Sequence, residues 1–240
     1  MENQWIRFFR IMKTKFWAMI KINLLEVIGN LPALLAAMSM ILGGNNLTVR
    51  FFGGYLLTCL QLVCIGPVQA GFIYTLRNYA REEHVFVLYD FIKGIRENWK
   101  QGLLVSLIDF ILISLMLYTL RFYILTAPAF GVMGELCMGL IVILILLYTM
   151  MHLYIYPMMI TLELTAKQLY GNALRLAAAR FLPNLGILVV IFAFNRLIFV
   201  HMLTGAAGIL LIGYSLPGFL STFYAYKGIE HYILKRRDEI

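Results

Sequence analysis

The chain carries little charge and little cysteine for its length. Only 13% of its 240 residues are charged, whereas 62% are hydrophobic. A soluble protein carries about 25% charged residues, because its surface must face water. The composition therefore excludes a water-exposed fold, and the excess of apolar side chains must face lipid.

Motifs for catalysis and for metal binding are also missing. The three cysteines exclude a disulfide framework, and the four histidines show no metal-binding spacing with them. The sequence has no Gly-x-Ser-x-Gly turn and no phosphate-binding glycine loop. We therefore expect a protein that is not an enzyme and that holds no cofactor or metal.

Long apolar runs are what the chain has in abundance. A bilayer core about 30 Å thick needs roughly twenty apolar residues per helix. Six runs reach that length, at residues 22–42, 51–76, 102–120, 136–162, 183–203 and 206–226. They predict an all-α polytopic transmembrane helical bundle, with residues 1–240 as a single integral membrane domain. A re-entrant hairpin is the alternative for the last two runs, because only Thr204-Gly205 separates them.

The basic residues predict the orientation of these spans. Five lie before or just inside the first run, five in residues 77–101, three in 163–182 and four from residue 227 onward; only Arg50, Arg121 and Arg196 remain. The positive-inside rule then places both termini and the two longer loops in the cytoplasm. Since the net charge of +8 resides in these flanks, we expect no nucleic-acid partner.

Three segments have the pattern of amphipathic helices at the cytoplasmic surface. In residues 1–20, aromatic side chains recur at three-to-four spacing between basic ones, which predicts a helix in the headgroup plane with its cations toward water. A cleaved signal peptide is less favoured there, because the basic region is long. Residues 85–99, in the loop 77–101, and the loop 163–182 alternate in the same way, and each is able to dock a partner or to serve as an interfacial connector.

A proline recurs at one position in each helix that returns to the cytoplasm. Pro67, Pro157 and Pro217 each precede a basic residue by ten positions. Proline removes a backbone hydrogen bond and kinks a helix. The spacing suggests three kinks along a common seam, although proline is also simply frequent in membrane helices.

Two ionisable residues lie deep in the predicted spans. Asp109 is in the third run and His152 is in the fourth, at similar expected depths. An unpaired charge in the bilayer is costly, so we expect both side chains to face protein and to form a polar pair. The pair either joins helices or serves a proton relay. Glu26 in the first run has no obvious partner.

With these residues identified, the chain resembles the YesL-like family of bacterial integral membrane proteins of unassigned function. The resemblance rests on separated motifs over most of the chain. They are Asn23-Leu24-Leu25 with Asn30-Leu31-Pro32, Gly66-Pro67 with Ala70-Gly71, Arg77-Asn78 with Arg81-Glu82-Glu83, Asp90-Phe91 with Asn98-Trp99-Lys100, and Tyr156-Pro157 with Lys167 and Asn172-Ala173-Leu174. Glu26 departs from the pattern, and the last two spans match only in hydropathy.

The resemblance implies a plasma-membrane protein often encoded beside carbohydrate-uptake transporters. We therefore expect a non-catalytic accessory or regulatory protein for carbohydrate uptake, whose partner is a transporter permease or its ATPase. The candidate docking residues are Arg77, Arg81, Asp90, Phe91 and Trp99. The alternative is a transporter subunit or a small secondary carrier. The three prolines would supply its discontinuous helices, and Asp109 and His152 its coupling residues.

Overall fold

A computed structural model describes residues 4–42, 44, 46, 48, 54, 57–198, 205 and 207–230, and these residues form helices with no strand among them. The elements are α1 (Gln4–Thr14), α2 (Phe16–Gly29), α3 (Leu31–Leu42), α5 (Leu57–Ala80), α6 (Val87–Met159), α7 (Ala166–Ala179), α8 (Phe181–Ile198), the π-helical turn η2 (Ile209–Gly213) and α10 (Ser215–Ile229). The predicted all-α membrane bundle is confirmed.

Five described stretches are long and apolar enough to cross a membrane. They are Leu57–Ala80, Val87–Thr126, Ala129–Met159, Phe181–Ile198 and Ile209–Ile229. The first predicted span, 22–42, is instead divided between α2 and α3, because the helix breaks at Asn30. Arg50, the predicted span limits near residues 51, 203 and 206, and the tail 231–240 lie outside the described residues.

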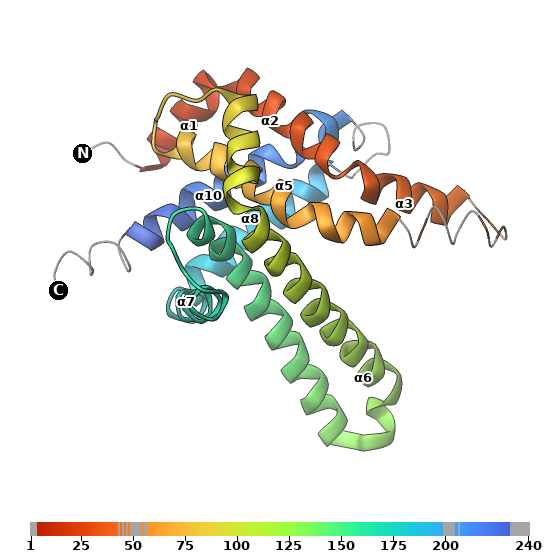
Figure 1. Ribbon diagram of the computed structural model, residues 1–240. Coiled ribbons are helices and arrows are strands. Elements are labelled where there is room, and N and C mark those ends of the chain that lie inside the picture. The colour runs from red at the N-terminus through yellow and green to blue at the C-terminus, as the bar shows by residue number, and fades with distance from the viewer. Residues whose placement is uncertain are drawn as a thin grey trace.

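The longest element, α6, is a helical hairpin that leaves the rest of the bundle (Figure 1). Its first arm runs from Val87 to Thr126, and the backbone reverses at Gly131, where φ is 57° and ψ is −143°. The segment 85–99, expected as a short amphipathic helix, is helical from Val87 onward but continues directly into the first arm and is not a separate helix. At 40 residues that arm is about 60 Å long, so much of it extends beyond a bilayer core of about 30 Å.

Glycines bring α5 and the start of α6 into backbone contact. A Cβ atom added to Gly66 would lie 1.9 Å from the carbonyl oxygen of Gly102, and one on Gly71 would lie 2.5 Å from that of Phe91. Small residues allow such close approach between membrane helices. Gly94 and Gly102 of α6 both face α5 across this interface. Because neither has a side chain, the two helices can approach this closely.

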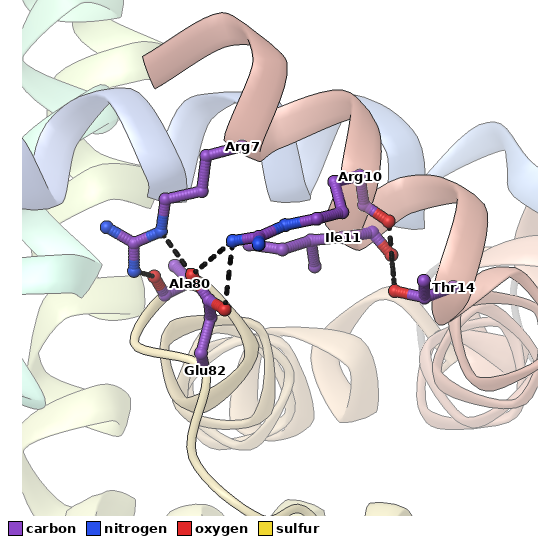
Figure 2. Close-up of polar contacts among 6 residues, drawn as sticks. All are labelled: Arg7, Arg10, Ile11, Thr14, Ala80 and Glu82. Carbon is purple, nitrogen blue, oxygen red and sulfur yellow. Dashed lines mark hydrogen bonds and ion pairs between the residues drawn. The ribbon is translucent and has the colours of Figure 1, made fainter. Parts of the chain in front are cut away.

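The N-terminal helix α1 is docked on the bundle by one aromatic ring and two arginines. Phe8 stacks on Phe219 of α10 with ring centroids 5.2 Å apart. Figure 2 shows Arg7 and Arg10 converging on Glu82, with Arg7 Nε 2.5 Å from Oε1 and Arg10 Nη2 3.2 Å from Oε2. Both cations therefore bind Glu82, and their side chains remain 34% and 50% exposed. Glu82 sits in a left-handed turn, with φ of 58°.

Helix α7 lies inside the predicted loop 163–182 and packs as its pattern indicated. Thr165 caps its first turn together with Gln168 in a capping box. Its buried residues are Leu169, Ala173, Leu176 and Ala177, which are the apolar positions expected from the sequence. The packing places this helix against α6.

The three prolines have different neighbours in the structure. Pro67 lies inside α5 at the contact with Gly102, whereas Pro217 lines an apolar cavity between α1, α8 and α10. Pro217 is the third residue of α10, where a missing N–H removes no helical hydrogen bond. Pro157 lies near the end of α6. The equal spacing in sequence therefore does not place Pro67 and Pro217 on one seam.

A candidate intramembrane polar site

Asp109 is held by two tyrosines from different elements. Tyr148 of the second α6 arm donates to Asp109 Oδ1 at 2.5 Å, and Tyr170 of α7 donates to the same oxygen at 2.6 Å. Asp109 itself lies on the first arm and is only 9% exposed. Hydrogen bonds to a carboxylate are stronger than those between neutral groups. The Oδ1 atom therefore firmly links the first arm of α6, its second arm and α7.

His152 lies beside this carboxylate without a hydrogen bond. Its Nε2 atom is 3.6 Å from Asp109 Oδ1, and it is buried with no hydrogen-bond partner among the described residues. Tyr148, one turn earlier on the same face, meets the imidazole edge-on with centroids 4.9 Å apart. The structure thus brings the two predicted residues together, but the tyrosines, which were not predicted, make the bonds.

A cavity of about 400 Å³ opens beside Asp109 and His152. Its polar lining comes from Gln69 of α5 and from side chains of both α6 arms, namely Ser106, Asp109, Ser114, His152 and Tyr156. Both phenols and the imidazole approach Oδ1 of Asp109, a lining residue of this cavity. Such a mixed polar and apolar hollow is the usual form of a small-ligand site.

A second buried carboxylate, Glu26, serves the break between α2 and α3. Its Oε1 accepts a hydrogen bond of 2.9 Å from Asn30 Nδ2, and Asn30 Oδ1 accepts one of 2.6 Å from Gln61. Gln61 Oε1 in turn accepts from the backbone N–H of Ala33 at 3.2 Å. The chain of side chains replaces the helical bonds lost at the break. Glu26 Oε2 is buried without a partner among the described residues.

Asn23 likewise supplies side-chain hydrogen bonds to the backbone, here at the irregular turn between η2 and α10. Its Nδ2 donates to the carbonyls of Ile209 and Leu210 at 2.6 and 2.8 Å. Its Oδ1 accepts from the N–H groups of Tyr214 and Ser215 at 2.8 and 3.0 Å. All four hydrogen-bonding positions of one buried amide are therefore used to close a break in a neighbouring helix.

The five candidate docking residues divide into buried and exposed groups. Arg77 is buried and donates to the carbonyl of Ile160 at the end of α6, at 2.6 Å. Asp90 is buried and accepts from the N–H of Phe86 at 2.9 Å, and Phe91 is buried against α5. These three side chains hold helix ends and interfaces, so they are not available to a partner. Arg81 and Trp99 are exposed.

The structural roles of several residues were not predicted from the sequence, although Asn23, Glu26 and Asn30 were noticed there. Asn23, Glu26 and Asn30 are spaced by three and four positions, which places them on one helical face. A polar stripe in an apolar helix was the available signal, and it indicates partners on a neighbouring element. Tyr148 carried a similar signal, four residues before His152. Tyr170 carried none, because α7 is brought to Asp109 only by tertiary packing.

No group of three or more potential metal ligands occurs in the part of the chain that the structure describes. The buried carboxylate, the two phenols and the imidazole can instead bind a hydroxyl-bearing molecule or exchange a proton. The same hydrogen bonds also join both arms of α6 to α7.

Comparison with known proteins finds one related family model. The model, described as "Protein of unknown function, DUF624", matches residues 44–120. The matched stretch contains α5, the glycine contact with α6 and Asp109, whereas Tyr148, His152 and Tyr170 lie beyond it. No curated protein and no solved structure matches the chain.

Proposed function

We propose that this protein is a non-catalytic accessory or regulatory protein of the bacterial plasma membrane that serves carbohydrate uptake by docking a transporter permease or its ATPase. The carbohydrate link rests on the resemblance to the YesL-like family. The observation that supports docking is an exposed apolar stripe on the start of α6, made by Leu88, Ile92 and Trp99.

The stripe is presented by a rigid support. Leu88 is 58% exposed and Trp99 49% exposed, and the spacing of the three residues by four and seven positions puts them on one face. The opposite face is fixed to α5, because Gly94 lies against Tyr74 and Gly71. A preordered apolar face loses little entropy on binding, which suits a docking surface.

Basic residues beside the stripe favour a partner whose contact surface is bordered by acidic residues. Arg96 and Lys100 lie on the exposed side of the same helix, and Arg81 lies in the preceding turn, paired with Glu83 at 2.9 Å. Rim charges of this kind steer association and fix its register.

The proposed orientation places both termini, the α5–α6 turn and α7 in the cytoplasm. Alkaline phosphatase is active only outside the cytoplasm, so a fusion after Asn46 or at residues 127–131 should be active. Fusions at Glu83, at Tyr170 and at the C-terminus should be inactive. An active fusion at Glu83 would overturn this topology.

The docking proposal is tested by photocrosslinking in intact membranes. A photoreactive residue at position 99 or 88 should capture a permease or ATPase of carbohydrate uptake, whereas one at Phe91, on the buried face, should not. Arg81→Ala and Trp99→Ala should each lower recovery of that partner about tenfold.

Tyr118→Ala is the matched control, because Tyr118 is an exposed aromatic residue on the outer part of the same α6 arm, nineteen positions beyond Trp99. Recovery should be unchanged in this variant. Equal loss with Tyr118→Ala and Trp99→Ala, or capture from position 91, would contradict docking through the stripe.

A small secondary carrier is the second candidate, favoured by the cavity beside Asp109 and by the broken helix at Asn30. Discontinuous helices and a midplane carboxylate are typical of carriers. Sugar uptake by the purified protein alone in liposomes, abolished by Asp109→Asn, would establish this function and displace the accessory role.

A further inference from the structure

A groove between α1, α8 and α10 is a second site, separate from Asp109 and from the α6 stripe. Helix α8 packs loosely here, since Asn184 and Ile187 are its only buried residues among those the structure describes. A spanning helix with so little protein contact leaves space against its neighbours. Two adjoining cavities occupy that space.

The first cavity, of about 470 Å³, is basic. Arg180, which ends α7 directly before α8, and Lys227, near the end of α10, both line it, and no carboxylate of the described residues does. Lys227 bonds to Gln4 of α1, and the Arg180 guanidinium lies over the ring of Tyr224 at 4.4 Å. Neither cation forms an ion pair within the described residues. Two unneutralised charges in one hollow attract an anion.

The Arg180 guanidinium is held in place by its surroundings. Tyr224 donates to Asn184 Oδ1 at 2.7 Å, which fixes the ring beneath the cation. Gly228 makes room for Arg180, because a Cβ atom there would lie 2.3 Å from Nη1. The charge is therefore positioned by α8 and α10 together, and its position does not depend on an anion.

The second cavity, of about 270 Å³, is wholly apolar. Ile191, Phe194, Leu216, Pro217 and Leu220 contribute to its lining. It shares Trp5, Ile187 and Val190 with the basic cavity. The two hollows therefore form one groove, basic at the start of α8 and apolar further along that helix.

We propose that this groove binds an anionic phospholipid, with the phosphate between Arg180 and Lys227 and one acyl chain along α8. The order of the lining matches the order of head and tail in such a molecule. Basic pockets between membrane helices commonly bind anionic headgroups. Free phosphate would leave the apolar half without an occupant, and a neutral lipid would leave both cations without a counter-charge. This site goes beyond the proposed docking function.

Trp5 lines both cavities, so its fluorescence reports on the bound chain. The full protein, with Trp17 and Trp99 replaced by Phe, is reconstituted in phosphatidylcholine vesicles. Phosphatidylglycerol with brominated acyl chains, which quench tryptophan on contact, is then titrated in. Brominated phosphatidylcholine with the same chains is the reference, and we expect half-maximal quenching at a mole fraction about tenfold lower for the anionic lipid.

Charge variants test the headgroup half. Arg180→Gln and Lys227→Gln should each raise the mole fraction of phosphatidylglycerol needed for half-quenching about fivefold. Arg175→Gln is the matched control, because Arg175 is exposed and lines neither cavity. An equal shift with all three variants would mean that only general surface charge attracts the lipid, and would overturn the site.

A filling variant tests whether the lipid needs the space of the basic cavity. Gly186 lines the basic cavity, and a Cβ atom there meets nothing within 4 Å. Gly186→Leu should therefore fold and should remove the preference for phosphatidylglycerol. Gly139→Leu, at an equally open position on the α6 hairpin, should retain it.

Three further results would overturn the proposal. One is equal quenching by the two brominated lipids, and another is an unchanged preference in Gly186→Leu. The third is loss of Trp5 quenching by brominated phosphatidylglycerol when water-soluble glycerol phosphate is added at millimolar concentration. That result would identify a site for the free anion. If Gly186→Leu fails to fold, the two Gln variants decide, since they remove charge without adding volume.

Discussion

Two apolar regions of the molecule differ in what covers them. The glycine contact between α5 and α6 is covered by protein, whereas the outer part of the α6 hairpin is not. The hairpin arm Ala129–Met159 reaches a mean hydropathy of 2.5, against 1.5 for α5. Among the described residues of 110–147, only Gly134 is buried, whereas nearly all of 148–159 are. The more hydrophobic region is therefore the less buried one, because lipid and not protein covers it.

This difference shows where side-chain detail matters. At the glycine contact, backbone meets backbone and no added atom fits. On the outer hairpin, Gly139 has nothing within 4 Å of the place where a Cβ atom would lie. Identical substitutions should have opposite consequences in the two regions, and the following predictions use that contrast.

The largest effect is expected for Gly66→Val. The new Cβ atom would lie 1.9 Å from the carbonyl of Gly102, so the two helices must separate at a cost of about 3 kcal/mol or more. Thermal unfolding of the detergent-solubilised protein, followed by size-exclusion chromatography, measures the loss. Gly139→Val should lose under about 1 kcal/mol. Equal losses would remove the distinction between the two regions.

A smaller effect is expected for Asn23→Ala in the packed region. The substitution removes four hydrogen bonds at the η2–α10 turn, and unpaired buried groups make the variant about 2 kcal/mol less stable. Asn172→Ala is the control, because Asn172 only accepts one bond from Arg175 at 3.3 Å. The same melting experiment should show little change for the control, and a wild-type melting curve for Asn23→Ala would refute the assignment.

Tyr170→Phe should have a moderate effect that depends on Asp109. Burial, and then the bond to Asp109, raise the pKa of the Tyr170 phenol, so the hydroxyl remains a donor across the accessible pH range. A double-mutant cycle with Asp109→Asn should give a coupling of about 1 kcal/mol. Tyr118→Phe, on the exposed hairpin, should give no coupling, and a coupling as large as that of Tyr170 would count against the site.

The smallest effect is expected for Glu82→Gln, which removes the ion pairs with Arg7 and Arg10. Partly exposed pairs contribute about 0.2–1 kcal/mol, and salt screens them. The stability difference from wild type should therefore shrink between low and high salt. Glu82→Gly should recover part of the loss, since glycine adopts the positive φ without strain. A salt-independent difference would show that charge is not the cause.

Much of the fold could be predicted, and the errors have definite physical causes. The spans containing Asp109 and His152 followed from hydropathy alone. The break at Asn30 was missed because an apolar run does not show where hydrogen bonds leave the backbone for side chains such as Gln61. The segment 85–99 was expected as a short surface helix because its pattern is amphipathic, whereas it continues into the first arm of α6 and only its side with Phe91, Gly94 and Ile95 packs on α5.

The sequence by itself determined the class, the apolar segments and the nearness in depth of Asp109 and His152, because the bilayer imposes length and polarity on every span. Only the tertiary structure decided which apolar faces meet protein, which tyrosines hold Asp109 and that Arg77 closes the end of α6. These contacts join residues 39 to 83 positions apart, and no local pattern encodes which distant side chain fills a given bond.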